Sequence, residues 1–462
     1  MSIMPEGLLT EARALQPQLL ADRRQLHAHP EVGPDLPQTR EYVARRLREM
    51  GYDPRPLAGG LTADITGRDT GRCVLLRADI DALRITERTD LPFRAENGAM
   101  HACGHDLHAA MLLGAAQLLR QHQAELSGTV RLVFQPDEEG FTGAKAMLAA
   151  GVLTAEPRPQ SALALHVHSG TPTGLVLCGR GTFMAGCTLF RVTVRGTGCH
   201  GAMPETGVDP LNIAAHIYLA LQELPAREVA AKQPAVITVG ELHGGTARNV
   251  IAGTAYLAGT VRTYGDKTHE EMPELMRRIV EHTAAALGAE AELTDYTIAN
   301  YKVENDAASS ERCRQAVLKC LGPAGEGHYR GTLSGEDFSE YLRRVPGVLA
   351  FVGTRNPQIG ATYAQHSCFY KIDESVLAKG SMVAAQYAID FLAEPTQEEL
   401  DGPTIAAVAE TNPDLAAKLR SAKATAAEAR DAMHDARTAR HAAIKGIHDA
   451  RAAARHEEKR DE

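Results

Sequence analysis

The stretch that decides the fold begins with CVLLRAD (73–79), continues through HDLHAAMLLGAAQLLRQH (105–122) and ends with TVRLVFQ (129–135). The first and last segments are short, apolar and bounded by turn residues, which is typical of buried strands. The middle segment carries apolar residues at helical spacing. Strand, helix and strand in this order predict a βαβ unit, and therefore a mixed, mostly parallel sheet flanked by helices.

Further elements on both sides extend this pattern. SALALHV (161–167) and GVLAFVG (347–353) are predicted to be strands of the same sheet, and helices are predicted near 307–321 and 375–393. We therefore expect an α/β domain that is built from two separate segments of the chain.

The segment between the two halves has a different order. Residues 186–302 show strand, helix, strand, strand, helix, strand, which is typical of the ferredoxin-like split βαβ fold. Asp209 is a predicted N-cap, and Thr268, with a glutamate three residues later, predicts a capping box at the second helix. A complete unit of this kind predicts a domain inserted between 1–185 and 303–395.

The C-terminal segment, 396–462, is rich in alanine and in charges of both signs. Asn412-Pro413-Asp414 is a good helix start, so we expect a helical tail. It is either a single solvated helix or a weak coiled-coil or partner-binding helix whose partner is unknown. Three histidines at seven-residue spacing (434, 441 and 448) could bind a metal, but repeated HDAR motifs also explain their spacing.

Composition limits the possible functions. With 462 residues, two or three domains are expected. The net charge of −9 argues against a nucleic-acid binder and against a polybasic membrane-surface protein. The sequence has neither a run of about 18 apolar residues nor the layout of a signal peptide, so we expect a cytoplasmic protein. Eight scattered cysteines are too few for a disulfide framework.

Residues that could bind a metal follow several predicted strands. Cys103 and His105 lie two apart at a turn before the first helix, and thiolate and imidazole are good ligands for zinc-like ions. Glu138 and Glu139 follow one buried strand, and His166 ends another. Open α/β sheets place their sites at the carboxyl ends of strands, so these residues are expected to meet there.

Two more motifs add to this pattern. RADIDAL (77–83) places Asp79 and Asp81 on one face of a strand, where an aspartate can orient a metal-binding histidine. AQHSCFYKIDE (364–374) contains His366 after a glycine-rich turn. Taken together, the motifs predict a dinuclear hydrolase, in which nitrogen and oxygen ligands hold two metals and a carboxylate acts as general base.

On these residues the sequence resembles the dinuclear metallopeptidase family of aminoacylases and carboxypeptidases. Within it, the resemblance is to the branch with hippurate hydrolases, auxin-conjugate amidohydrolases and N-acyl-amino-acid amidohydrolases. It covers roughly residues 10–395. The matching stretches are RRQLHAHPEVG (23–33), RADIDAL (77–83), HACGHDLHAAMLLGAA (101–116), FQPDEEG (134–140), ALHVHSG (164–170), GCHGAMPETGVDP (198–210), ARNVIAGTAYLAGTVRT (247–263) and SGEDFSEYLRRVPG (334–347).

The resemblance implies a role for each matching residue. Glu138 is implied as general base and proton shuttle, and Asp81 as support for the metal site, a role that Asp79 could share. Two divalent ions (zinc, manganese, cobalt or nickel) are implied as cofactors. The implied metal ligands are Cys103, His105, Glu139, His166 and His366.

The resemblance also implies roles for the inserted domain. His200, as a catalytic and substrate-binding residue, and Asn249, as a substrate-binding residue, would polarise the scissile carbonyl or hold the substrate carboxylate, often at the site of a neighbouring subunit. The inserted domain, 186–302, would mediate a homodimer. The implied reaction is amide hydrolysis of an N-acyl amino acid to a carboxylic acid and a free amino acid.

Other functions stay open at this point. N-acetyl-diaminopimelate deacetylation, or cleavage of dipeptides or C-terminal residues, would use the same site. A non-catalytic metal-binding scaffold with a partner-binding tail is an alternative of another class, and a hydrolase with Cys103 as nucleophile is a further one. The sequence departs from the family pattern at Arg84, Asp137, His168-Ser169 and Ala252, none of which is an implied ligand.

Overall fold

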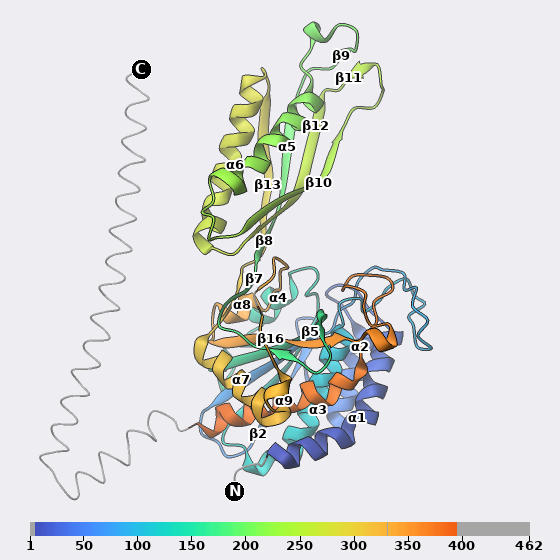
Figure 1. Cartoon of the computed structure of the whole chain (residues 1–462), viewed down its shortest axis with the longest axis vertical. Coiled ribbons are helices and arrows are strands. Elements are labelled where there is room, and N and C mark those ends of the chain that lie inside the picture. The colour runs from blue at the N-terminus through green and yellow to red at the C-terminus, as the bar shows by residue number, and fades with distance from the viewer. Residues whose placement is uncertain (1–4, 330, 395–462) are drawn as a thin grey trace, which may run out of the picture. The chain divides into compact units, whose positions relative to one another are not determined.

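A mixed eight-stranded sheet forms the centre of the chain (Figure 1). The computed structural model describes residues 5–329 and 331–394. The order of the strands is β1-β2-β4-β3-β5-β16-β6-β15. Its central strands are parallel, and β1, β2 and β6 add antiparallel pairings. The prediction of a mixed, mostly parallel sheet is confirmed. The eight strands are β1 (Arg55–Leu57), β2 (Gly60–Thr66), β3 (Cys73–Asp79), β4 (Thr129–Gln135), β5 (Ser161–Pro172), β6 (Val176–Leu177), β15 (Glu326–Gly327) and β16 (Gly347–Arg355).

The predicted strands and helix of the opening stretch agree closely with the structure. β3 and β4 have the predicted bounds, and the helix α3 runs from His105 to Gln121. α3 begins there because Gly104, at its N-cap, has φ +95°, a conformation that glycine adopts without strain. β5 is longer than predicted, because its parallel pairing with β16 continues to Pro172.

Helices cover both faces of the sheet, so the central strands are buried on both sides. Val74 and Leu76 of β3 belong to a large core shared with α1, α3, α7 and α9, which lie together in Figure 1. Leu75, which points the other way, packs in a second core with residues of α4 and α8. The helices are α1 (Pro5–Ala28), α2 (Pro37–Glu49), α4 (Gly143–Ala149), α7 (Ala307–Leu321), α8 (Ser339–Leu342) and α9 (Leu377–Ala393).

The segment after β7 forms a second sheet with the order β10-β12-β8-β13, and all its pairings are antiparallel. The helices α5 and α6 pack against it around a core of its own, which includes Val192, Ile217 and Met276. The predicted ferredoxin-like order is confirmed. The elements are β8 (Gly186–Arg195), α5 (Pro210–Arg227), β10 (Ala235–Gly244), β12 (Thr254–Thr263), α6 (Asp266–Ala286) and β13 (Glu290–Asn300).

Two short ladders accompany this second sheet. One pairs β7 with β14, and the other pairs β9 with β11 beyond the end of β8. Their strands are β7 (Gly181–Met184), β9 (Cys199–His200), β11 (Val250–Ile251) and β14 (Val303–Asn305). The described residues also include short 3-10 helices: η1 (Gln123–Glu125), η2 (Pro204–Thr206), η3 (Pro323–Gly325), η4 (Pro357–Ile359) and η5 (Glu374–Val376).

The predicted helix caps of this segment have different outcomes. Asp209 is the N-cap of α5, and its carboxylate accepts hydrogen bonds from the backbone N–H groups of Leu211 and Asn212. The prediction that Thr268 caps α6 is wrong: the helix begins at Asp266, with Gly265 as the N-cap. The Thr268 hydroxyl instead donates to the side chain of Gln233, 2.6 Å away, which is a tertiary contact that the local pattern does not reveal.

The described residues up to Ala393 form one compact unit. The domain boundaries at 186 and 302 stay a prediction. The predicted tail, 396–462, lies outside the described residues. Among the helices that the structure describes, none has both the length and the apolar character to cross a membrane.

Candidate metal centre

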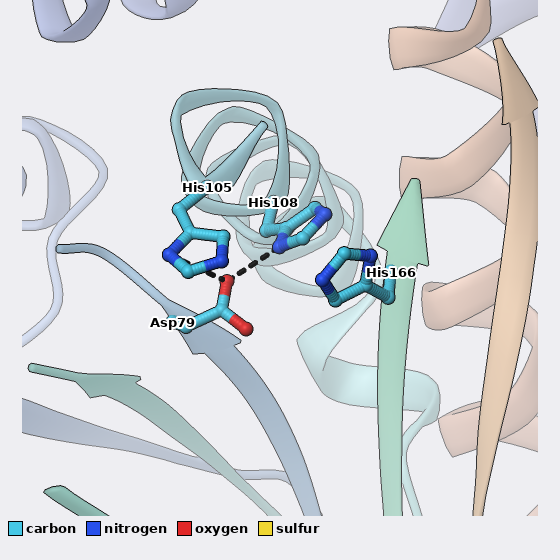
Figure 2. Close-up of side chains that lie close together, drawn as sticks. All are labelled: Asp79, His105, His108 and His166. Carbon is cyan, nitrogen blue, oxygen red and sulfur yellow. Dashed lines mark hydrogen bonds and ion pairs between the residues drawn. The ribbon is translucent and has the colours of Figure 1, made fainter. Parts of the chain in front are cut away.

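The carboxyl ends of three parallel strands bring the candidate residues together. Asp79 ends β3 and stands in register with Gln135 at the end of β4. His166 lies on β5, and His105 opens α3 directly above the sheet edge. Figure 2 shows Asp79, His105 and His166, together with His108, pointing toward one another. The polar residues therefore meet where a parallel sheet is expected to place a site.

The five residues implied as ligands form one cluster. Ligand atoms of Cys103, His105 and Glu139 all lie within 4.8 Å of one another. The Cys103 Sγ is 3.6 Å from Nε2 of His166, and Nε2 of His366 is 3.3 Å from Oε1 of Glu139. A thiol, three imidazoles and a carboxylate converging in this way form a donor set that suits zinc-like divalent ions.

The histidines are oriented by hydrogen bonds on their other ring nitrogen. His105 Nδ1 donates to the carbonyl oxygen of Asp81 at 2.9 Å, and His166 Nδ1 donates to that of Val167 at 2.7 Å. Because a carbonyl oxygen can only accept, each Nδ1 carries a proton, and Nε2 is the nitrogen that can coordinate a metal. Burial lowers the pKa of His166, which favours the neutral imidazole that a metal needs.

His108 is close to the cluster but both of its nitrogens are engaged. Its Nδ1 hydrogen-bonds Oδ1 of Asp79, and its Nε2 accepts from the backbone N–H of Val167 at 2.8 Å. His108 therefore supports the site from behind. Asp81 has a similar place: its Oδ2 accepts from the N–H of Glu139 at 3.1 Å while its Oδ1 lies 3.2 Å from Nδ1 of His105.

Glu138 is the carboxyl group beside the candidate ligands. Its Oε2 is 3.9 Å from Nε2 of His105, and its side chain is buried. Burial, together with the nearby carboxylates of Glu336 and Glu139, raises the pKa of Glu138 well above its usual range. A carboxyl group with a raised pKa can both take up and release a proton near neutral pH, which suits a general acid–base.

The backbone around these groups holds an unusual conformation at two positions. Asp137 has φ +53° and His366 has φ +66°, in the left-handed region that non-glycine residues seldom adopt. The Asp137 carboxylate accepts from the Thr142 hydroxyl, and the His366 N–H donates to the carbonyl of Ala102 at 2.8 Å. Such conformations persist only where the surroundings enforce them, and they are frequent at functional sites.

His200 and Asn249 lie elsewhere on the chain. His200 is on β9, in register with Val250 on β11, and the Asn249 carbonyl accepts from the N–H of Gly201 at 2.9 Å. Both residues are exposed. The β9–β11 ladder brings them together near the Arg195 end of β8, whose ten residues span about 30 Å.

The chemistry of the cluster fits divalent cations. The buried Nε2 of His105 makes no hydrogen bond within the described chain. Such orphaned buried atoms are rare unless a ligand satisfies them. Cys103 and Glu139 also raise the pKa of His366 to about 10, which shows that the surroundings favour positive charge.

The sequence interpretation missed one part of the site. Behind the ligands lies a buried guanidinium, Arg77, which pairs with Glu336 and Asp337, and the carboxylates of these two acids cluster with that of Glu138. The signal was present in the motifs RADIDAL and SGEDF: a charged residue inside a buried strand requires a partner of opposite charge.

The sequence of this chain is similar to those of known proteins. A family model described as "Peptidase family M20/M25/M40" matches residues 75–390. Thermostable carboxypeptidase 1 of Saccharolobus solfataricus is 35% identical over 393 residues, which cover 84% of this chain and 98% of the relative. N-acetylcysteine deacetylase of Bacillus subtilis is 36% identical over 384 residues, which cover 82% and 98%.

A solved structure extends the likeness to three dimensions. The Bacillus subtilis YXEP protein, described as a dinuclear metal binding peptidase from the M20 family, has a TM-score of 0.72 and 33% sequence identity. The match covers 83% of this chain and 99% of that one. From the family model and relatives that match along nearly their whole length, the chain belongs to peptidase family M20/M25/M40 and is a metal-dependent hydrolase.

Proposed function

We propose that this hydrolase cleaves the amide bond of N-acyl amino acids and releases a carboxylic acid and a free amino acid. The observation that carries the proposal is the convergence of Cys103, His105 and Glu139 beside the buried carboxyl group of Glu138. The names of the two relatives point to substrates with a common part: an N-acyl cysteine and a peptide C-terminus both present an amide whose amine side carries a free carboxylate.

Two divalent metal ions, zinc, manganese, cobalt or nickel, are proposed as cofactors. They would supply Lewis acidity, which polarises a carbonyl group and lowers the pKa of water. Cys103, as a thiolate, would contribute negative charge and a soft ligand. The proposed ligands are Cys103, His105, Glu139, His166 and His366.

Glu138 is proposed as the group that moves the proton. Its carboxylate would take a proton from the attacking water and then donate it to the nitrogen of the departing amino acid. The raised pKa of Glu138, which burial causes, supports this double role because the protonated form is then stable enough to exist between the two transfers. Asp81 and Asp79 would hold His105 and His108 in place throughout.

His200 and Asn249 are proposed to act at the site of a second copy of the chain. Their place beyond the far end of β8 supports this, because it directs them away from the strand's Gly186 end. Eight of the eleven exposed large apolar side chains of the described chain lie within 186–302, among them Leu219 with 64% exposure, which supports a homodimer through this segment. Light scattering on Leu219→Glu tests it: a dimer in the wild type and a monomer in the variant are expected.

Two alternatives are less well supported by the geometry. Burial and the Glu139 carboxylate raise the pKa of the Cys103 thiol, whereas a nucleophilic cysteine needs a lowered pKa. A non-catalytic scaffold leaves the buried Glu138 carboxyl group without a role. Cleavage of dipeptides, of C-terminal residues or of N-acetyl-diaminopimelate would use the same site. Which of these substrates the protein hydrolyses distinguishes among the reactions.

The test is the release of free amino acid by protein loaded with manganese or zinc. The substrates are N-acetyl, N-benzoyl and long-acyl amino acids, dipeptides and N-acetyl-diaminopimelate. Glu138→Gln should abolish release, because it removes the proton carrier and keeps the volume. Glu340→Gln is the matched control, since Glu340 is equally buried but pairs only with Arg344. No release from any N-acyl amino acid, or an active Glu138→Gln variant, would contradict the proposal.

A partner of the tail also stays a proposal. A chain that ends after residue 395 would be compared with the whole chain for amino-acid release and for particle mass. Equal values would show that the tail takes part neither in catalysis nor in assembly.

A further inference from the structure

One buried arginine contacts both halves of the candidate site. The side chain of Arg77 is 1% exposed and all three of its nitrogens are engaged. One terminal nitrogen lies 2.6 Å from Asp79, and the other lies 2.8 Å from Asp337 and 3.2 Å from Glu336. The Nε atom donates to the side chain of Gln135 at 3.0 Å. A single guanidinium therefore joins the ends of β3 and β4 to the loop before α8.

The contact with Asp79 leads to the imidazoles. Asp79 accepts from Nδ1 of His108, whose Nε2 in turn accepts from the N–H of Val167. Val167 follows His166, the proposed ligand on β5. Three successive hydrogen bonds thus connect Arg77 to the backbone beside this proposed ligand.

The contact with Asp337 connects Arg77 to the turn that carries the carboxylates of Glu138 and Glu139. Asp337 accepts from the side-chain amide of Gln135 at 2.8 Å and from the N–H of Ala144 at 2.9 Å. Gln135 and Ala144 bracket the turn that carries Glu138 and Glu139. Its two ends are therefore fixed by one carboxylate, and that carboxylate is held by Arg77.

We propose that Arg77 is a positioning residue that sets the spacing between the imidazole half and the carboxylate half of the metal site. The inference rests on the proposed function, because it concerns the ligands assigned there. Arginine suits this place because its planar fork presents five donors in fixed directions, whereas lysine has three on one flexible nitrogen. The hydrogen bonds and ion pairs of Arg77 go to Asp79, Gln135, Glu336 and Asp337, none of which is a proposed ligand.

The charges around Arg77 strengthen the inference. The carboxylates of Glu138, Glu336 and Asp337 come within 4.8 Å of one another in a buried region, but Arg77 already pairs with two of them, so the trio is not an additional metal site. Without the guanidinium, Glu336 and Asp337 would be buried carboxylates with no ion-pair partner in the described chain, and Asp79 would keep only the imidazoles of His105 and His108. Their repulsion and desolvation would drive the strand ends and the loop apart.

The experiment compares Arg77→Met and Arg77→Lys with Arg131→Met. Arg131 is an equally buried arginine on the neighbouring strand β4, where it pairs with Asp64 and two backbone carbonyls away from the site. Each full-length protein is loaded with cobalt(II). The measurements are the cobalt dissociation constant by chelator competition, the thiolate-to-cobalt absorption, kcat and KM for the best N-acyl amino acid, and the unfolding temperature.

Both methionine variants should lose stability, because each leaves buried acceptors unpaired. Only Arg77→Met should weaken cobalt binding and lower kcat, each by about 10–100-fold, which is the usual effect of losing a group that orients metal ligands. KM should change less than kcat, and Arg77→Lys should recover part of both losses. Equal cobalt affinity and kcat in Arg77→Met and Arg131→Met would overturn the inference.

Two further outcomes are distinguishable. If Arg77→Met does not fold, Asp337→Asn and Arg77→Lys take its place against Arg131→Met, and a cobalt affinity equal to that of the control overturns the inference. If the wild type itself shows no thiolate-to-cobalt absorption, the proposed metal site fails and the inference fails with it. A wild type that binds cobalt, beside an unaffected Arg77→Met, overturns the role of Arg77 alone.

Discussion

The Sγ atom of Cys103 lies 3.6 Å from Nε2 of His166, although 63 residues separate the two in the sequence. Cys103 precedes α3 and His166 lies on β5, so the contact crosses from the helix start to the sheet edge. Both residues are buried. A thiol and an imidazole in this arrangement can share one metal ion.

Replacing Cys103 by alanine should therefore reduce metal retention. We expect a loss of affinity at least as large as the 10–100-fold that removal of an outer supporting group causes, because a direct ligand is lost. The measurement is the zinc that remains on the protein after dialysis against a chelator. Cys187→Ala is the control, since Cys187 is equally buried but lies on β8. Equal zinc retention in both variants would contradict the assignment of Cys103.

A side chain at Gly104 should damage the site through a steric clash. A Cβ atom on Gly104 would lie 2.4 Å from the side chain of Val167, the residue after His166. Gly104→Ala should lose the usual 1–2 kcal/mol, roughly, of left-handed strain and, in addition, metal affinity. Gly71→Ala is the control, because Gly71 also has a positive φ (+69°) but has open space around it. Chemical denaturation and metal titration of both variants separate strain from clash.

Stability should fall at alkaline pH through a buried thiol. Burial raises the pKa of Cys73 from its ordinary value near 9 to about 12. Between pH 8 and 10 the unfolded chain releases this proton while the folded chain keeps it, so rising pH favours unfolding. This thiol alone should lower the unfolding free energy by about 1.4 kcal/mol over that range. The difference in pH dependence between the wild type and Cys73→Ala measures it, and parallel curves would contradict the prediction.

Loss of the cap at α5 should destabilise the second sheet and its helices. The carboxylate of Asp209 satisfies the N–H groups of Leu211 and Asn212 at 3.0 and 3.3 Å. Asp209→Ala should cost about 1 kcal/mol of unfolding free energy, whereas Asp209→Asn, which can also cap, should cost less. Urea denaturation followed by circular dichroism checks both. Equal losses in the two variants would point to the charge of Asp209 instead of its cap.

The central strands, and the meeting of the candidate ligands at one sheet edge, were predictable because the apolar runs and the polar motifs that follow them are local signals. The apolar runs of β3 and β4 end at turn residues, and their bounds were correct. Cys103 and His105 lie two residues apart in the sequence and close together in the site. The N-cap of α6 was predicted incorrectly because the Thr268 hydroxyl bonds to Gln233, 35 residues away.

The support behind the ligands could not be predicted from local patterns. Arg77 meets Asp337 across 260 residues, which include the whole second sheet. An arginine within a buried strand indicates that an acidic partner exists, but several acidic segments of the sequence could have supplied this partner. Likewise, Asp79 and His108 share a hydrogen bond only because α3 returns over the edge of β3.

Because β8 is long, a small rotation at one of its ends produces a large displacement at the other. A rotation of about 10° at its Gly186 end would move the opposite end, which lies near His200 and Asn249, by about 5 Å. Hydrogen bonds connect the Gly186 end of β8 to another loop. The N–H of Ala185 donates to the carbonyls of Thr332 and Ser334 at 3.2 and 3.0 Å. These residues begin the loop that carries Glu336 and Asp337. A rotation of the second sheet would therefore also displace the loop that carries the Glu336 and Asp337 carboxylates.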